Sequence, residues 1–188
     1  MDFENPSELS PMKPLLLCLS SLLIPCLIQG QSDPVMIRLV DPLDEPEFYC
    51  VDIPGFRQNV QLKAPLMAHT LKRFGSADEM FILDHPSKGQ IFAAEYGLCI
   101  EAASASSGAE LLLKEPSDSP LQRFALTEKG ALVLTDHPEL GFTIDSKDGT
   151  KAGGPSHVRR DLRLKTVSDS PANLTTWKLV KSAANWPE

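Results

Sequence analysis

Residues 48–52 (FYCVD), 98–102 (LCIEA) and 142–146 (FTIDS) are three versions of one short motif. Each version places an aliphatic residue directly before an acidic one, and the versions begin 50 and 44 residues apart. Spacing of this size is typical of repeat proteins, in which one unit is too small to bury its own apolar face. The motif therefore predicts three repeats that share a single core.

Three further signals recur after this motif. A predicted strand ends in Leu-Lys, an aromatic residue has an aliphatic residue two positions later, and a Lys-Gly pair suits a turn with positive φ. The Leu-Lys pairs are Leu62-Lys63, Leu113-Lys114 and Leu164-Lys165, the aromatics are Phe81, Phe124 and Trp177, and the turns are Lys88-Gly89 and Lys129-Gly130. We expect the three aromatics to meet in the core.

The apolar pattern has a period of two throughout, with short runs bounded by Gly, Pro, Ser and Asp, which favours an all-β fold. The run Val35–Val40 is expected to form a strand that closes against the C-terminus, and Leu66–Phe74 is the best candidate for a short helix. The other predicted strands are residues 49–53, 109–113, 131–134, 142–144 and 177–180.

The N-terminus is predicted to be a targeting segment. Lys13 precedes an apolar run, Pro14–Ile28, which is short for a membrane span and suits a signal peptide over residues 1–30. The acidic residues before Lys13 leave Met12 as a possible true start, and an uncleaved anchor is the alternative. Residues 31–47 then lead into the repeats, residues 183–188 form a tail, and the predicted location is secreted and extracellular.

A chain of 188 residues has room for one ordinary domain, and its net charge of -7 disfavours non-specific nucleic-acid binding. Cys50 and Cys99 remain after signal cleavage, and they occupy matching positions in successive repeats. An oxidising compartment permits a disulfide between them, whereas burial in strands favours two free thiols, so both states stay open.

These motifs resemble the ricin-type (R-type) β-trefoil lectin domain, whose repeats open with Cys-apolar-Asp and later carry Gln-x-Trp. Cys50-Val51-Asp52 matches the opening, and Cys99-Ile100-Glu101 approximates it. Gln122-Arg123-Phe124 is a Gln-x-aromatic, and Thr175-Thr176-Trp177 keeps the tryptophan. The resemblance implies a β-trefoil of about twelve strands over residues 48–182, with repeats at about 48–97, 98–141 and 142–182. It also implies a carbohydrate-binding, non-catalytic function.

That family binds galactose-type sugars in shallow pockets, with a carboxylate, a stacking aromatic and an amide. Here Lys63 stands where the stacking aromatic is expected, and Asp78-Glu79 replaces the Asn-Gln step, so Phe56 is the candidate for the missing aromatic face. The carbohydrate-binding residues implied by the resemblance are Asp52, Phe56, Asn59, Gln61, Glu101, Gln122 and Asp145. The structural alternative is that the three acids brace their own loops.

No repeat keeps the full sugar-binding set, which leaves a second hypothesis. In it the trefoil has lost sugar binding and acts as a protein-interaction or inhibitor module, through the loops at residues 66–77 and 157–160. A hydrolase is a weaker third hypothesis, because neither G-x-S-x-G nor H-E-x-x-H occurs and His85 and His137 stand in Asp-His-Pro turns. The expected partners are glycans or a protein, with no cofactor, metal, nucleic acid or membrane.

Overall fold

The computed structural model describes Met1 and residues 33–145, 147–154 and 156–182. The chain divides into two units, Met1–Gly30 and Gln31–Glu188, and every described strand belongs to the second. The predicted signal peptide and the tail at residues 183–188 lie outside the described residues. Among the residues that are described, no helix has the length and apolar character needed to cross a membrane.

The described residues form thirteen strands, which are nearly all of the regular structure, together with four single-turn 3-10 helices. The strands of the first two repeats are β2 (Tyr49–Asp52), β3 (Met67–Thr70), β4 (Ile82–Leu83), β5 (Ile91–Ala93), β6 (Leu98–Ala102), β7 (Ala109–Lys114), β8 (Phe124–Leu126) and β9 (Leu132–Leu134). The third repeat holds β10 (Leu140–Ile144), β11 (Thr150–Lys151), β12 (Val158–Thr166), β13 (Trp177–Val180) and β1 (Met36–Leu39). Twelve of these strands make three four-strand repeats, and β11 is an addition to the third.

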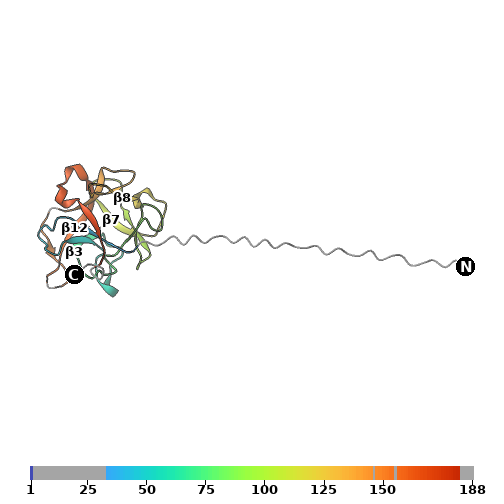
Figure 1. The fold of residues 1–188 in the computed structure, drawn as a ribbon, viewed down its shortest axis with the longest axis horizontal. Coiled ribbons are helices and arrows are strands. Elements are labelled where there is room, and N and C mark those ends of the chain that lie inside the picture. The colour runs from blue at the N-terminus through green and yellow to red at the C-terminus, as the bar shows by residue number, and fades with distance from the viewer. Residues whose placement is uncertain (2–32, 146, 155, 183–188) are drawn as a thin grey trace. The chain divides into compact units, whose positions relative to one another are not determined.

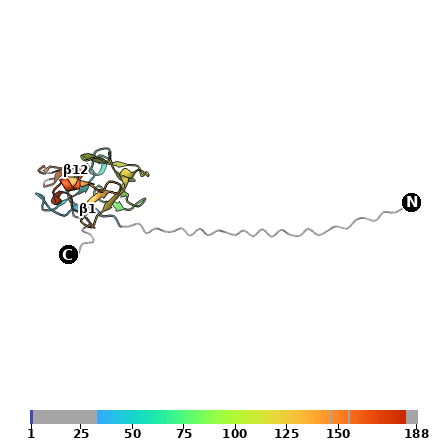
Figure 2. The same cartoon turned by 90° about the horizontal axis from the view of Figure 1, so that it is seen from above.

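One pairing pattern occurs three times. The first strand of a repeat pairs with the second, the third pairs with the fourth, and the fourth pairs with the first strand of the next repeat. Strand β1 is the fourth strand of the third repeat, since it pairs with β13 from Met36↔Val180 to Leu39↔Trp177. The predicted closing strand is thus confirmed. The long strand β12 lies between β3 and β7 (Figure 1), and its place relative to β1 can be followed in Figure 2.

The three predicted aromatics are core residues. Phe81, Phe124 and Trp177 are 0%, 4% and 1% exposed and belong to a single hydrophobic cluster to which all three repeats contribute. The indole Nε1 of Trp177 donates to the carbonyl oxygen of Phe142 at 2.9 Å, so its polar atom is satisfied in the core. Alternating strand residues from each repeat therefore close over one shared interior, as the repeat argument predicted.

The second strand of repeat one differs from the prediction. Leu62-Lys63 lies in a loop, and the strand that pairs with β2 is β3, inside the segment for which a short helix was expected. The cause is the connection: 14 residues separate β2 from β3, whereas six separate β6 from β7. A longer loop moves the strand along the sequence without changing its ladder.

The Leu-Lys pairs are also not equivalent in the other repeats. Lys114 pairs with Cys99 in the ladder, whereas Lys165 pairs with Gly141, two positions away from the corresponding place. The residues that match Lys114 are His69, opposite Cys50, and Arg163, opposite Thr143. The Leu-Lys pattern aligned Lys63 and Lys165 with Lys114. In the structure, His69 and Arg163 occupy the ladder positions that match Lys114.

Cys50 and Cys99 are buried and both are free thiols, so of the two states left open the structure has the unbridged one. Burial raises the pKa of the Cys50 thiol well above its usual value, and raises that of Cys99 to about 11. Both residues therefore serve as small apolar strand residues.

Candidate ligand-binding pocket

A pocket of about 810 Å³ opens between the first and third repeats. One side is the β2–β3 hairpin with its long connection, and the other is the β11–β12 hairpin. The residues that line it are Asp52, Pro54, Gly55, Phe56, Gln61, Met67, His69, Lys72, Lys151, Ala152, Gly153, Gly154, His157 and Arg159. The pocket includes three of the seven sequence-predicted site residues: Asp52, Phe56 and Gln61.

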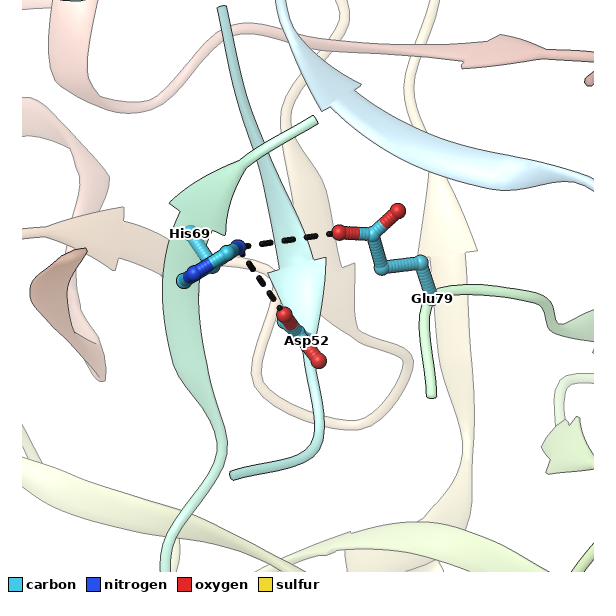
Figure 3. A group of neighbouring side chains, drawn as sticks. All are labelled: Asp52, His69 and Glu79. Atoms are coloured by element: carbon cyan, nitrogen blue, oxygen red, sulfur yellow. Dashed lines mark ion pairs between the residues drawn. The ribbon is translucent and has the colours of Figure 1, made fainter. Parts of the chain in front are cut away.

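The floor of the pocket is part of a group of buried charged side chains, of which Asp52, His69 and Lys72 line the pocket. Asp52, His69, Lys72, Asp78 and Glu79 form this repeat-one charge cluster, in which Lys72 is the only one more than about a tenth exposed. The ammonium Nζ of Lys72 lies 3.1 Å from Asp52 Oδ2, 2.5 Å from Asp78 Oδ2 and 3.2 Å from Glu79 Oε1. Figure 3 shows the side chains of Asp52, His69 and Glu79 converging from separate segments of the chain.

Burial and charge pairing act together on the pKa values of Asp52 and Lys72. Burial raises the pKa of Asp52 well above its usual range; Lys72 opposes this shift, and Glu79 and Asp78 add to it. For Lys72, burial disfavours the ammonium, but the carboxylates of Asp52 and Glu79 outweigh it and raise its pKa. Lys72 is therefore the fixed positive charge that holds three carboxyl groups together.

The donor atoms of Asp52, His69 and Glu79 lie within 4.8 Å of one another, which raises the question of a metal ion. The nitrogen that faces the carboxylates is His69 Nδ1, which is also 2.8 Å from the carbonyl oxygen of Thr70. Because a carbonyl only accepts, Nδ1 carries the proton and has no lone pair to donate. Lys72 already supplies the cation, so this donor set does not suit a metal ion.

The connection between β2 and β3 presents an aromatic ring to the pocket. Phe56 is 51% exposed, although it is flanked by the guanidinium of Arg57, which lies 4.9 Å from the ring centroid. Gly55 has φ +103°, and a Cβ at this position would overlap the carbonyl oxygen of Asn59, so the close loop requires glycine. The backbone N–H of Gln61 donates to the carbonyl oxygen of Pro54 at 2.7 Å and closes the loop.

Asn59 and Gln61 precede Leu62-Lys63, where the sequence predicted the end of a strand, and this strand prediction is wrong. Asn59 lies in a single-turn 3-10 helix, Arg57–Asn59, is exposed and does not line the pocket. Gln61 lines the pocket from the loop that follows rather than from a strand. The strand assignment failed because it treated the long connection as part of the ladder.

The opposite wall belongs to the third repeat and was not predicted as part of this site. Arg159 stands opposite His69 in the ladder between β12 and β3, and the rings of His157 and His69 meet edge to face with centroids 5.1 Å apart. The sequence signal was the His157–Arg160 stretch, which was predicted to be a surface loop, whereas strand β12 begins within it at Val158. The strand pairing that brings this stretch next to the first repeat could not be predicted from the sequence.

The acidic positions of the other repeats lie elsewhere. In repeat two, Gln122 Nε2 donates to Glu101 Oε2 at 2.9 Å and to the carbonyl oxygen of Glu115 at 2.8 Å. Gln122 is fully buried, and its Oε1 accepts from Gln90 Nε2 and from the backbone N–H of Ser117. This amide therefore braces the repeat.

In repeat three, Asp145 Oδ1 accepts from the backbone N–H of Lys147 at 3.0 Å, and Oδ2 lies 3.9 Å from Lys165 Nζ. Thr175 stands where repeat two has Gln122, and its hydroxyl faces backbone carbonyls. The structure therefore does not bring Glu101, Gln122 and Asp145 to the pocket that holds Asp52.

Comparison with known proteins establishes the fold. No known protein-family model and no curated protein sequence matches the chain. Among solved structures it is similar to the C-terminal half of the earthworm R-type lectin in complex with GalNAc, at 14% identity and a TM-score of 0.55, with 79% of this chain and 98% of that chain covered.

It is also similar to the β-trefoil lectin of the Vibrio vulnificus hemolysin/cytolysin with N-acetyl-D-lactosamine bound, at 15% identity and a TM-score of 0.53, over 80% of this chain and 95% of that one. It is similar as well to the agglutinin from Abrus precatorius, at 14% identity and a TM-score of 0.57, with 80% of this chain and 49% of that chain covered. The chain has the β-trefoil fold of the ricin-type lectins.

Proposed function

We propose that this protein is a secreted, non-catalytic glycan-binding protein, and that it binds through the pocket between β2–β3 and β11–β12. The observation that carries the proposal is the half-exposed ring of Phe56 in the wall of a pocket with a polar floor. Export rests on the sequence of residues 1–30 alone, and the absence of catalysis rests on the sequence motifs.

The pocket has the chemistry that sugar recognition requires. An aromatic face packs on the apolar side of a pyranose ring, and Gln61 and the ring of His69 offer hydrogen bonds to hydroxyl groups. Similar structures with GalNAc and N-acetyl-D-lactosamine bound give the proposal further support. The ligand would sit on the first repeat and touch the third.

The test compares two exposed phenylalanines. Phe56→Ala removes the ring in the pocket, whereas Phe74→Ala removes a ring that is 76% exposed and outside the pocket. We expect glycan binding on an array to weaken at least about ten-fold in Phe56→Ala and to be unchanged in Phe74→Ala. Equal binding by both variants, or loss in Phe74→Ala alone, would remove this pocket from consideration.

A second candidate function is recognition of a protein partner. It is favoured by the internal use of polar groups, since Lys72 covers Asp52 and Gln122 is saturated by Glu101 and its neighbours. Phe74, exposed in the loop that follows β3, would then be a contact residue. The same two variants separate the functions, because crosslinking to a protein partner would be lost in Phe74→Ala and kept in Phe56→Ala.

A further inference from the structure

The wall of the pocket that the third repeat forms carries positive charge and no acid. Its charged residues are Lys151 and Arg159, and His157 adds an imidazole. On the opposite side Lys72 is offset by Asp52, Asp78 and Glu79, and Asp52 is the sole acid that lines the pocket. The whole chain has a net charge of -7. A basic wall on an acidic protein concentrates positive potential in one hollow.

The one acid is not available to a ligand. Asp52 is 1% exposed, and its Oδ2 lies 3.1 Å from Lys72 Nζ. Its other oxygen, Oδ1, is buried as well and has no hydrogen-bond partner among the described residues. A neutral sugar would therefore find Lys72 in front of the carboxylate that would otherwise accept its hydroxyl hydrogens.

Arg159, by contrast, is available. It is exposed, and no ion pair to it occurs within residues 33–145, 147–154 and 156–182. The nearest acid on its own strand, Asp161, lies 3.8 Å from Arg163 and does not line the pocket. Asp78 and Glu79, behind the floor, are engaged with Lys72.

From this arrangement we infer that the ligand is an acidic saccharide, whose carboxylate or sulfate group binds Arg159 while a sugar ring packs on Phe56. The inference rests on the proposed function and specifies its ligand class. A guanidinium presents paired N–H donors that match the oxygens of either group, and a charge-assisted pair of this kind is stronger than a neutral hydrogen bond.

The binding assay uses the folded chain and one oligosaccharide backbone in three forms: neutral, sulfated and carboxylated. We expect at least one acidic form to bind about ten-fold more tightly than the neutral form, and the advantage to shrink as salt rises from about 0.05 to 0.5 M. The acidic form that binds more tightly, sulfated or carboxylated, identifies the group that the pocket recognises. Equal affinity for all three overturns the inference and leaves glycan binding intact, whereas no binding in any arm overturns both.

A variant pair ties the effect to the pocket. Arg159→Gln should abolish the acidic preference, and Arg159→Lys should keep part of it. Arg163→Gln is the matched control, because it makes the same charge change on the same strand and Arg163 does not line the pocket.

Two results would contradict the assignment. One is loss of preference in Arg163→Gln to the same extent as in Arg159→Gln, which would indicate a general charge effect. The other is retention of full acidic binding in Phe56→Ala, which would show an anion held without a sugar ring. Sulfate ion alone serves as the competitor in both cases.

Discussion

Repeats one and two each place a second polar side chain near the acid of the first strand, but this second side chain is a carboxylate in repeat one and an amide in repeat two. Glu79 and Gln122 both stand two residues before a core aromatic, and each lies near the acid in the first strand of its repeat. An amide can donate to an acid, but a second carboxylate cannot, so repeat one requires Lys72 between Asp52 and Glu79. The motif shows the two acids, but it does not show the lysine, which comes from the loop after β3.

Removal of Lys72 should be strongly destabilising. In Lys72→Met three carboxyl groups stay buried together without a cation, and we expect the free energy of unfolding in urea to fall by about 3 kcal/mol. Adding Glu79→Gln copies the arrangement of repeat two and should recover part of the loss. If Lys72→Met alone leaves stability unchanged, the cluster is not held by this lysine.

The pH dependence of Asp52 follows from its raised pKa. A carboxyl whose pKa is higher in the folded protein binds a proton on folding, so its contribution is present below the unfolded value, 3.8, and is lost as pH rises through the folded value. Asp52→Asn should therefore flatten the rise in melting temperature on acidification and leave the chain folded at pH 7. If the melting temperature of Asp52→Asn rose more steeply on acidification than that of the wild type, the raised pKa assigned to Asp52 would be contradicted.

At the scale of elements, the β11–β12 hairpin is tied to the start of the domain by Arg160. Its NH2 group lies 2.6 Å from Asp44 Oδ1, its Nε lies 3.2 Å from the Tyr49 hydroxyl, and its NH1 group also donates to the carbonyl oxygen of Lys147. The backbone N–H of Gly149 donates to Asp44 Oδ2 at 3.1 Å. This bracing holds in place the hairpin that carries His157 and Arg159.

Arg160→Met should loosen the hairpin. We expect a loss of about 2 kcal/mol of stability, because Arg160 is 9% exposed and the variant leaves the hydroxyl of the buried Tyr49 without this donor. Hydrogen exchange at the Gly149 amide should accelerate more than at strand amides of repeat two. Uniform acceleration across the domain would show a global effect and no specific bracing.

The stabilisation that Asp44 contributes to this bracing is lost at low pH. Burial raises its pKa, but hydrogen bonds from Arg160, Gly149 and Tyr49 prevail and lower it from 3.8 to about 2. A lowered pKa stabilises the folded state above the unfolded value and loses this effect as pH falls through the folded one. Asp44→Asn should thus reduce the melting temperature at pH 7 and have little effect near pH 2. A variant that loses as much stability near pH 2 as at pH 7 would contradict this direction.

The sequence predicted the fold well and the site in part, for reasons that belong to the elements. Period-two runs, core aromatics and Lys-Gly turns are local signals, and they placed the strands and the three repeats. His69 and Lys72 were missed because the 14-residue connection before β3 hid the ladder position of that strand. Arg159 was recognised as a surface residue, but its contact with repeat one arises only from long-range pairing.

Across the whole molecule, equivalent positions of the repeats do not carry equivalent pockets. The pocket of about 810 Å³ draws on the first repeat and the added strand β11 of the third, whereas the pocket around Thr143 and Lys165 in repeat three is about 200 Å³. In repeat two the amide of Gln122 donates to the carboxylate of Glu101, so these two groups are hydrogen-bonded to each other. We therefore predict one ligand per chain, bound in the pocket between the first and third repeats.

The most direct test is an amide chemical-shift titration of the isotope-labelled chain with the tightest-binding glycan from the array. We predict a single saturable site, with shifts confined to residues around Phe56, His69, Gly153 and Arg159. Shifts centred on repeats two or three, three equivalent sites, or none with a folded chain would contradict this prediction.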